Sequence, residues 1–187
     1  MILDAAIARF GRDGFRSTSV AEIARDADVG GTVTYAYFPN KEALFLAALD
    51  EDAAGVIQEG VSFLFTDTSD SRAWRETLIF TLVDAVERHP LARRVLRGLE
   101  PHVTGRMLEL PALTELRKAV AERLRTEQVT GIVRPDLDPV AVGSGMVVII
   151  ISVLMSILQF GREGIGLYGA DVLAVFEAAL DPPRSPS

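Results

Sequence analysis

The sequence of 187 residues contains no cysteine and only two histidines, His89 and His102. The missing cysteines exclude disulfide bonds, a thiol nucleophile and a zinc site with sulfur ligands, and they are typical of a protein of the reducing cytoplasm. Two histidines leave little material for a histidine-based metal site or catalytic triad. We therefore predict neither a metal ion nor a cofactor.

Basic residues are also scarce, because 19 Lys and Arg stand against 26 Asp and Glu and give a net charge of −7. This balance argues against a protein that coats nucleic acid without specificity. Residues 1–45 contain five basic and six acidic side chains. Any contact with DNA must therefore come from the placement of a few cations, together with hydroxyl groups and backbone N–H donors.

The motifs of common enzyme classes are missing as well. The sequence offers no glycine-rich phosphate loop with its lysine, no Ser-His-Asp arrangement and no carboxylate pair with metal-ligand spacing. An enzyme is the main alternative class of protein, and the absence of these motifs argues against it. Residues 1–10 are amphipathic rather than charged and then apolar, so we expect no signal peptide and a cytoplasmic location. Whether further residues precede them is left open.

The only long apolar run covers residues 140–160, and its 21 residues are long enough to cross a bilayer. Glycine and serine residues dilute the run, and Asp136 and Asp138 precede it in place of basic anchors. We interpret it as a buried bundle helix that also faces a partner subunit. A membrane-anchored or scaffolding helical protein is the alternative, and solubility without detergent separates the two.

Local signals in the first 45 residues predict three short helices. Apolar residues at helical spacing precede Gly14, and this glycine is predicted to cap the C-terminal end of the first helix. Ser19 and Glu22 match a capping box that starts the second helix. A break at residues 28–31 leads to a third segment, residues 32–38, which Pro39 stops. Its β-branched and aromatic residues favour a strand, but no partner strand exists, so we predict a helix.

The remaining sequence predicts an all-α fold, with a three-helix helix-turn-helix head (residues 1–45) and a C-terminal helical bundle (residues 46–187). A polar loop is expected at residues 67–71 and an unstructured tail at 181–187. Ile7, Phe10, Ile23, Val29 and Phe38 are expected to form the core of the head. The expected bundle helices are 40–62, 71–89, 91–98, 111–128, 138–161 and 170–180.

The N-terminal residues resemble the TetR family of regulators. Residues 14–24, GFRSTSVAEIA, are similar to its glycine–aromatic turn and following helix, and residues 27–45, ADVGGTVTYAYFPNKEALF, are similar to its signature around the recognition helix. The resemblance covers residues 2 to about 49. Gly30 replaces the usual serine cap, Gly31 lacks a side chain, and Val33 and Thr34 invert the usual threonine–apolar order.

The resemblance implies that the second helix of the pair enters the major groove of operator DNA. Lys41, a cation in the first turn of a helix, gains nothing from the helix dipole and would instead reach a phosphate. Each of these residues also has an interpretation without DNA. The tyrosines could pack in the core of the head, and Ser19 could serve only as a helix cap. The threonines and Lys41 could simply be exposed to solvent. The implied DNA-binding set is Thr18, Ser19, Gly30, Gly31, Thr32, Thr34, Tyr35, Tyr37 and Lys41.

The resemblance also implies a homodimer, formed mainly through helices 138–161 and 170–180, and an unidentified small-molecule effector bound inside the bundle. Arg93, Arg94 and Arg97 are expected to form a solvated face. Ordinary core packing is the alternative for each candidate effector residue, and a plain loop position for His102. The candidates are Trp74, Phe80, His102, Met107, Met146 and Met155. The implied function is a repressor that binds palindromic DNA and releases it when the effector changes the spacing of the two heads.

Overall fold

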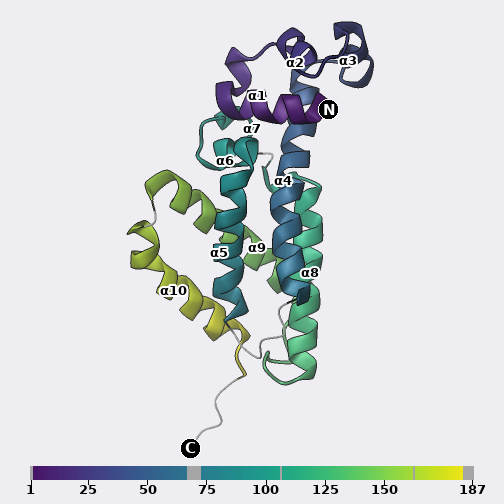
Figure 1. Ribbon diagram of the computed structural model, residues 1–187. Coiled ribbons are helices and arrows are strands. Elements are labelled where there is room, and N and C mark those ends of the chain that lie inside the picture. The colour runs from purple at the N-terminus through teal and green to yellow at the C-terminus, as the bar shows by residue number, and fades with distance from the viewer. Residues whose placement is uncertain (1, 67–72, 106, 162, 183–187) are drawn as a thin grey trace, which may run out of the picture.

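The computed structural model describes residues 2–66, 73–105, 107–161 and 163–182. All regular elements within these residues are helical, which confirms the predicted all-α fold. The molecule is elongated, with a small head at one end and a helical body that makes up the rest of its length (Figure 1). The predicted loop at residues 67–71 and residues 183–187 of the predicted tail lie outside the described residues.

The head consists of α1 (Ile2–Ser17), α2 (Val20–Asp26) and α3 (Gly31–Tyr37). Gly14 breaks α1 with a φ of 83°, the left-handed conformation that glycine adopts without strain. The predicted capping box at the start of α2 is confirmed. The Ser19 hydroxyl accepts from the Glu22 N–H at 3.3 Å, and the Ser19 N–H donates to the Glu22 carboxylate at 2.9 Å. Residues 31–37 are helical, as predicted against their strand propensity.

A long helix, α4, connects the head to the body without interruption (Figure 1). The helix passes through the domain boundary predicted at residue 45. The backbone is therefore continuous there, and the division into two functional domains stays a prediction. The other elements of the body pack along and across α4. The elements of the body are α4 (Lys41–Thr66), α5 (Trp74–Arg88), α6 (Pro90–Leu96), α7 (Pro101–Thr104), a 3₁₀ turn (Met107–Glu109), α8 (Ala112–Val129), α9 (Pro139–Phe160) and α10 (Glu163–Leu180).

Two parts of the predicted helix map are corrected. The C-terminal helix begins at Glu163 rather than at residue 170. Three glycines between residues 164 and 169 favoured a loop there, because each costs about 1 kcal/mol in a helix relative to alanine. The short helix α7 and the 3₁₀ turn after it were also not predicted, since both are too short to produce a helical period.

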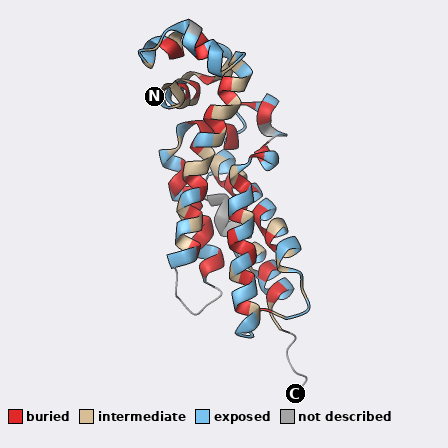
Figure 2. Ribbon diagram, turned by 90° about the vertical axis from the view of Figure 1, so that its right-hand side faces the viewer, coloured by how far each residue is buried: buried red, intermediate tan, exposed pale blue. Residues whose placement is uncertain are grey.

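Buried residues, red in Figure 2, occur on the helices of both the head and the body, and the apolar ones form one connected core. In the head Phe10 and Ile23 are fully buried as predicted, whereas Ile7, Val29 and Phe38 are half-buried. The apolar helix α9 buries one face and exposes the other, which agrees with the interpretation that it packs on its own core, while the partner subunit for the exposed face stays a prediction. It is long and apolar enough to cross a membrane by composition, but its buried residues pack against the body of the protein.

Candidate nucleic-acid interface and interior cavity

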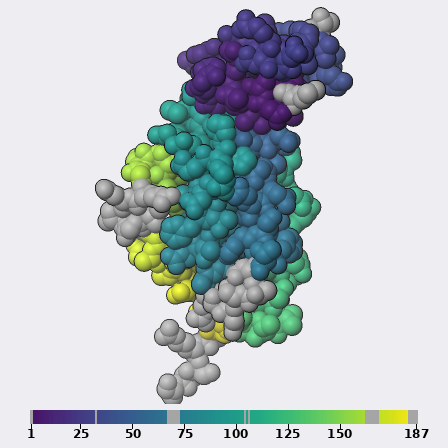
Figure 3. Space-filling view, viewed as in Figure 1, coloured from purple at the N-terminus to yellow at the C-terminus, as the bar shows by residue number. Residues whose placement is uncertain are grey.

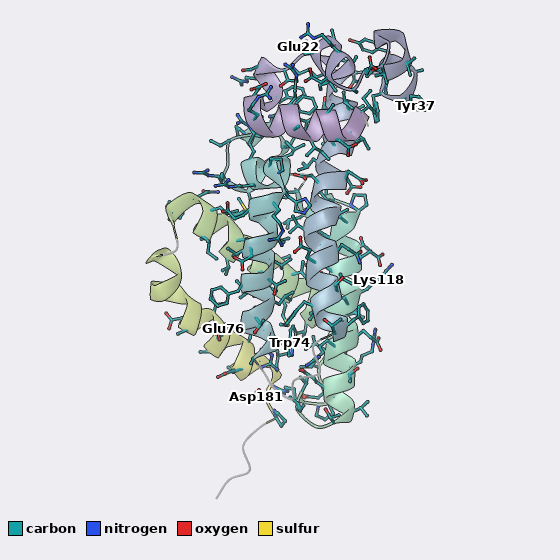
Figure 4. The ribbon with its side chains drawn as sticks, viewed as in Figure 1. Glu22, Tyr37, Trp74, Glu76, Lys118 and Asp181 are labelled. Carbon is teal, nitrogen blue, oxygen red and sulfur yellow. The ribbon has the colours of Figure 1, made fainter. Side chains whose placement is uncertain are left out.

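Helix α3 presents two tyrosines at the tip of the molecule. Tyr35 is 56% exposed and Tyr37 is 75% exposed, and Tyr37 lies at the outer edge of the head (Figure 4). Gly30 and Gly31, at the start of the same helix, are exposed too, and a Cβ added to Gly31 would meet no atom within 4 Å. The two tyrosines are therefore not packed in the core of the head, which was the alternative prediction. Both hydroxyl groups are available to a ligand.

Two threonines of the predicted DNA-binding set point inward. Thr34 is completely buried under α3, and Thr18 is buried with its hydroxyl donating to the Gly14 carbonyl at 2.9 Å. Neither side chain reaches the surface, and both are removed from the candidate interface. Thr18 instead closes the backbone at the bend that Gly14 makes in α1. The side chain of Thr32 lies outside those that the structure describes.

Ser19 is exposed at the start of α2, but its hydroxyl is committed to the capping box, where it also donates to the Glu22 carboxylate at 2.8 Å. The N-terminus of α3 has no such cap. Gly30 takes the cap position with an extended backbone, and it makes no side-chain hydrogen bond. The pair of glycines thus leaves the start of α3 as bare backbone.

Lys41 is the first residue of α4, and its ammonium group lies 4.5 Å from the centre of the Phe15 ring. This cation–π contact offsets the unfavourable position of a cation at a helix N-terminus and holds the side chain on the head. Lys41 as a whole is half-buried. It can therefore turn to a phosphate without breaking an ion pair.

Most charges near the tip are already paired. Arg9 lies 3.2 Å from Glu22 and donates to Asp26 at 3.0 Å, and Arg12 pairs with Asp13 at 2.7 Å. The hydrogen bond from Arg9 lowers the pKa of Asp26. The hydrogen bond from the Ser19 hydroxyl is the main cause that lowers the pKa of Glu22. Both carboxylates therefore stay ionised and are partly neutralised by Arg9.

Sequence reasoning missed two cations of the head. Arg16 and Arg25 are exposed, and neither forms an ion pair with any residue that the structure describes. Their exposure follows from the rotation of α1 and α2 in the head, so composition alone gave no signal. With Lys41 they are the cations that remain available for phosphate groups.

The same N-terminal segment matches a known family. The family model for bacterial regulatory proteins of the TetR family matches residues 2–48, which are α1 to α3 and the start of α4. The head thus resembles the TetR family over residues 2–48. The match covers the helix-turn-helix head, and the helical body is similar in fold to solved structures of TetR-family regulators.

Individual proteins are similar to this chain in fold or in sequence. A TetR-family regulator from Pectobacterium atrosepticum has the same fold, with a TM-score of 0.73 at 19% identity over 98% of this chain and 94% of that one. A γ-butyrolactone receptor aligns with a TM-score of 0.57 at 22% identity, covering 97% and 86%. The uncharacterised HTH-type transcriptional regulator YuxN of Bacillus subtilis is 42% identical over 50 residues, which are 27% of this chain and 17% of that protein.

The body contains a cavity of about 50 Å³ between α4, α5, α6, α8 and α9. Every residue that lines it is apolar, and most are aliphatic, so the cavity offers a ligand no hydrogen-bond partner from a side chain. From α4 the lining includes Ala53 and Val56, and from α6 it includes Ala92 and Val95. Two helices that reach the head therefore form walls of the cavity.

Of the six predicted effector residues, only Met107 lines this cavity. Trp74 is buried at the end of the body far from the head (Figure 4), where its indole N–H donates to Glu127 at 2.6 Å. Phe80 is 44% exposed on α5, and Met146 and Met155 pack into the core elsewhere. The cavity is lined mainly by aliphatic side chains, with Met107 as the methionine among them.

His102 also lies away from this cavity. It lies at the junction of head and body, with its ring 4.8 Å from Phe15 and 5.7 Å from Phe45. Beside it the buried Glu100 pairs with Arg94 at 2.7 Å. Arg94 was expected on a solvated face, but its guanidinium is turned inward to this carboxylate. The cluster belongs to the contact between α1 and the α6–α7 segment, not to the cavity.

On the same body, α9 presents an exposed face made mainly of small side chains. Gly145, Val148, Ser152 and Ser156 follow one another at intervals of three or four residues and are all exposed. A Cβ at Gly145 would meet no atom within 4 Å. The apolar face is therefore open to a second helix at close range.

Proposed function

We propose that this chain is a homodimeric transcriptional repressor of the cytoplasm, which binds a palindromic operator through its two heads and releases it when a small apolar molecule enters the body. The observation that carries the proposal is the pair of exposed tyrosines on α3, at the tip of a TetR-family head. In helix-turn-helix proteins the second helix of the pair lies in the major groove. On this chain that helix is α3, and it projects beyond the rest of the molecule (Figure 3).

Within this proposal Tyr37 and Tyr35 donate hydrogen bonds to DNA phosphates or base edges. Lys41, Arg16 and Arg25 supply the positive charge, because the other cations of the head are paired with carboxylates. A few phosphate contacts per head suit an acidic protein, since specificity then depends on the placement of groups and not on bulk charge. Ser19, Gly30 and Gly31 bring the backbone of the two short helices close to the duplex.

The dimer is proposed to form through the exposed faces of α9 and α10. Exposed apolar residues on both helices, such as Val148 and Val175, need a partner in water. Small residues at intervals of three and four let two helix backbones approach closely, as Gly145 and Ser152 do on α9. A twofold dimer also explains why the operator would be palindromic, with half-sites roughly 34–36 Å apart.

The cavity between α4 and α6 is the proposed effector site. Its lining favours an apolar molecule, whose affinity comes from the burial of its surface. Ligand sites typically measure about 300–1,000 Å³, so a volume of about 50 Å³ requires the helices to move apart as the ligand enters. The γ-butyrolactone receptor of similar fold supports a small organic effector for this chain as well.

Two contacts would carry that movement to the head. Asp52 of α4 accepts from the backbone N–H groups of Leu91 and Ala92, both at 2.8 Å, so α4 and α6 are tied together beside the cavity. Against α6, a Cβ added to Gly11 of α1 would lie 2.8 Å from the Pro90 Cβ. A displacement of α6 would therefore push directly on α1 and change the spacing of the two heads.

The experiment that tests the function is binding of the purified full-length chain to DNA fragments that flank its own gene. We expect one specific site, bound by a dimer. Tyr37→Ala should weaken that binding at least tenfold, and Phe65→Ala, which removes an exposed aromatic ring at the far end of α4, should not. Failure to bind any fragment at low salt, by a folded dimer, would refute the proposed function.

A further inference from the structure

The recognition helix of this chain lacks the side chains that usually distinguish base pairs. Residues 31–37, GTVTYAY, contain no arginine, lysine, asparagine, glutamine, aspartate or glutamate. Arginine and lysine recognise guanine through paired hydrogen bonds, asparagine and glutamine recognise adenine, and the acidic side chains accept from cytosine. None of these contacts can come from α3, so any sequence preference of α3 must have another chemical basis.

The orientation of α3 decides which groups reach the bases. A helix turns by about 100° per residue, so Ala36 lies almost opposite the buried Thr34. Val33 and Tyr35 flank the buried side, and Val33 is 48% exposed. Among the side chains of α3 that the structure describes, those of Val33 and Ala36 are the small apolar ones on the outward surface, and the tyrosine rings border them.

The glycines before Val33 leave its methyl groups uncovered. A Cβ added to Gly30 would lie 3.9 Å from the Val33 Cγ2, so a larger side chain there would shield that methyl group. At Gly31 a Cβ would meet nothing within 4 Å, which means that the protein itself does not require glycine for space. Two adjacent glycines allow the backbone to approach a ligand closely, and close approach is what short side chains such as Val33 and Ala36 need.

The major groove contains one apolar group, the C5 methyl of thymine. We propose that this chain selects operator half-sites by thymine methyl groups, which pack against Val33 and Ala36 on α3. This inference rests on the proposed function and adds to it the chemical class of sequence that the head recognises. Tyr35 and Tyr37 then fix the helix in the groove, and the half-site is rich in A·T pairs beneath α3.

The test begins with selection of duplexes from a random-sequence DNA pool by the full-length chain. Each thymine of the selected sequence is then replaced by uracil, which pairs identically but lacks the methyl group. Loss of one buried methyl contact should weaken binding about fourfold for one half-site and about fifteenfold for both. We expect this loss at one or two defined thymines per half-site.

Substitutions on α3 assign the contact. In Val33→Ala the contacted thymine and its uracil replacement should bind with nearly equal affinity, because the partner of the methyl group is gone. Thr34→Val changes the neighbouring residue by a similar amount, but its side chain is buried, so its uracil effect should equal that of the unmodified chain. Val33 is exposed and alanine favours helices, so Val33→Ala is not expected to unfold the head.

The possible failures are distinguishable. A selected palindrome that binds equally well with uracil at every thymine would overturn the thymine-methyl inference while leaving the repressor proposal intact. A uracil effect that persists unchanged in both Val33→Ala and Ala36→Gly would place the contact on another residue and overturn the assignment. Selection of no sequence at all would overturn the proposed function and this inference together.

Discussion

The backbone N–H of Phe15 donates a hydrogen bond to the Glu100 carboxylate at 3.1 Å, across 85 positions of the chain. This bond joins the head to the body directly after Gly14, where α1 bends. A Cβ at Gly14 would lie 2.7 Å from the same carboxylate oxygen, so the bond depends on the glycine. Arg94 of α6 donates to that oxygen at 2.7 Å. Glu100 therefore links α1 to α6, a helix that lines the cavity.

The first prediction concerns this link. Glu100→Gln leaves Arg94 without its carboxylate, and one amide oxygen cannot replace the charge that serves two donors. We expect the free energy of unfolding in urea to fall by about 1–3 kcal/mol. Glu87→Gln is the control, because it breaks an exposed ion pair with Arg93 at 3.2 Å and should cost less than about 1 kcal/mol. Equal losses for the two variants would mean that Glu100 contributes no more than a surface charge.

The second prediction concerns the cavity. Leu116 lines it from α8, whereas Leu124 is equally buried on the same helix and does not line it. Each change to alanine should destabilise the protein by about 2.7–5 kcal/mol, the range for buried leucines. Only Leu116→Ala enlarges the existing apolar space, so benzene should raise the melting temperature of that variant alone. A similar rise for Leu124→Ala would show that benzene binds elsewhere or fills any new hole.

The third prediction concerns the proposed dimer. Gly145→Arg places a long charged side chain on the exposed face of α9, where the subunit itself has open space. The monomer should keep its helical content, since arginine favours helices more than glycine does, while sedimentation should detect loss of the dimer. Gln58→Arg adds the same charge to an exposed position of α4 and should remain dimeric. A dimeric Gly145→Arg variant would exclude this face as the interface.

The fourth prediction is a pH dependence in the head. The pKa of Asp26 is lowered by its hydrogen bond to Arg9, so the pair stabilises the folded state fully above the ordinary pKa of about 4. That stabilisation is lost as the pH falls through the lowered pKa of the folded state. Asp26→Asn should thus be less stable than the unmodified chain at pH 7, and the difference should shrink below pH 4. Urea unfolding at several pH values measures it, and a difference that grows in acid would contradict the assignment.

The helix-turn-helix elements could be predicted because their signals are local. Gly14, the Ser19–Glu22 box and Pro39 each determine a helix end within a few residues, whatever the rest of the chain does. The side on which a residue of α3 lies could not be predicted, because seven residues give too short a period to fix the rotation of the helix. Thr34 was therefore assigned to the DNA surface although packing buries it.

Five of the six candidate effector residues lie away from the cavity for a different reason. Aromatic and methionine side chains were chosen by type, yet Trp74 is held by Glu127 and His102 by the rings at the head junction. The cavity is defined by five helices from distant parts of the sequence, and where space remains between them depends on their packing. The link between Phe15 and Glu100 is equally invisible in the sequence, since no local pattern relates two positions so far apart.

The last prediction concerns Lys41 and the salt dependence of DNA binding. The affinity of a protein for duplex DNA falls with salt according to the number of phosphates that its cations neutralise, with a slope of about −0.9 per contact. Among the residues that the structure describes, the Phe15 ring is the partner of the Lys41 charge, and two copies of Lys41 in a dimer would neutralise two phosphates. Lys41→Ala should therefore make the slope of log affinity against log salt less steep by about 2, with little change in the preferred sequence.

Lys118→Ala removes an exposed lysine on α8, where it pairs with Glu115 at 2.8 Å, and should leave the slope unchanged. An unchanged slope for Lys41→Ala would mean that its ammonium group stays on Phe15 in the complex, and the positive charge at the duplex would then have to come from Arg16 and Arg25.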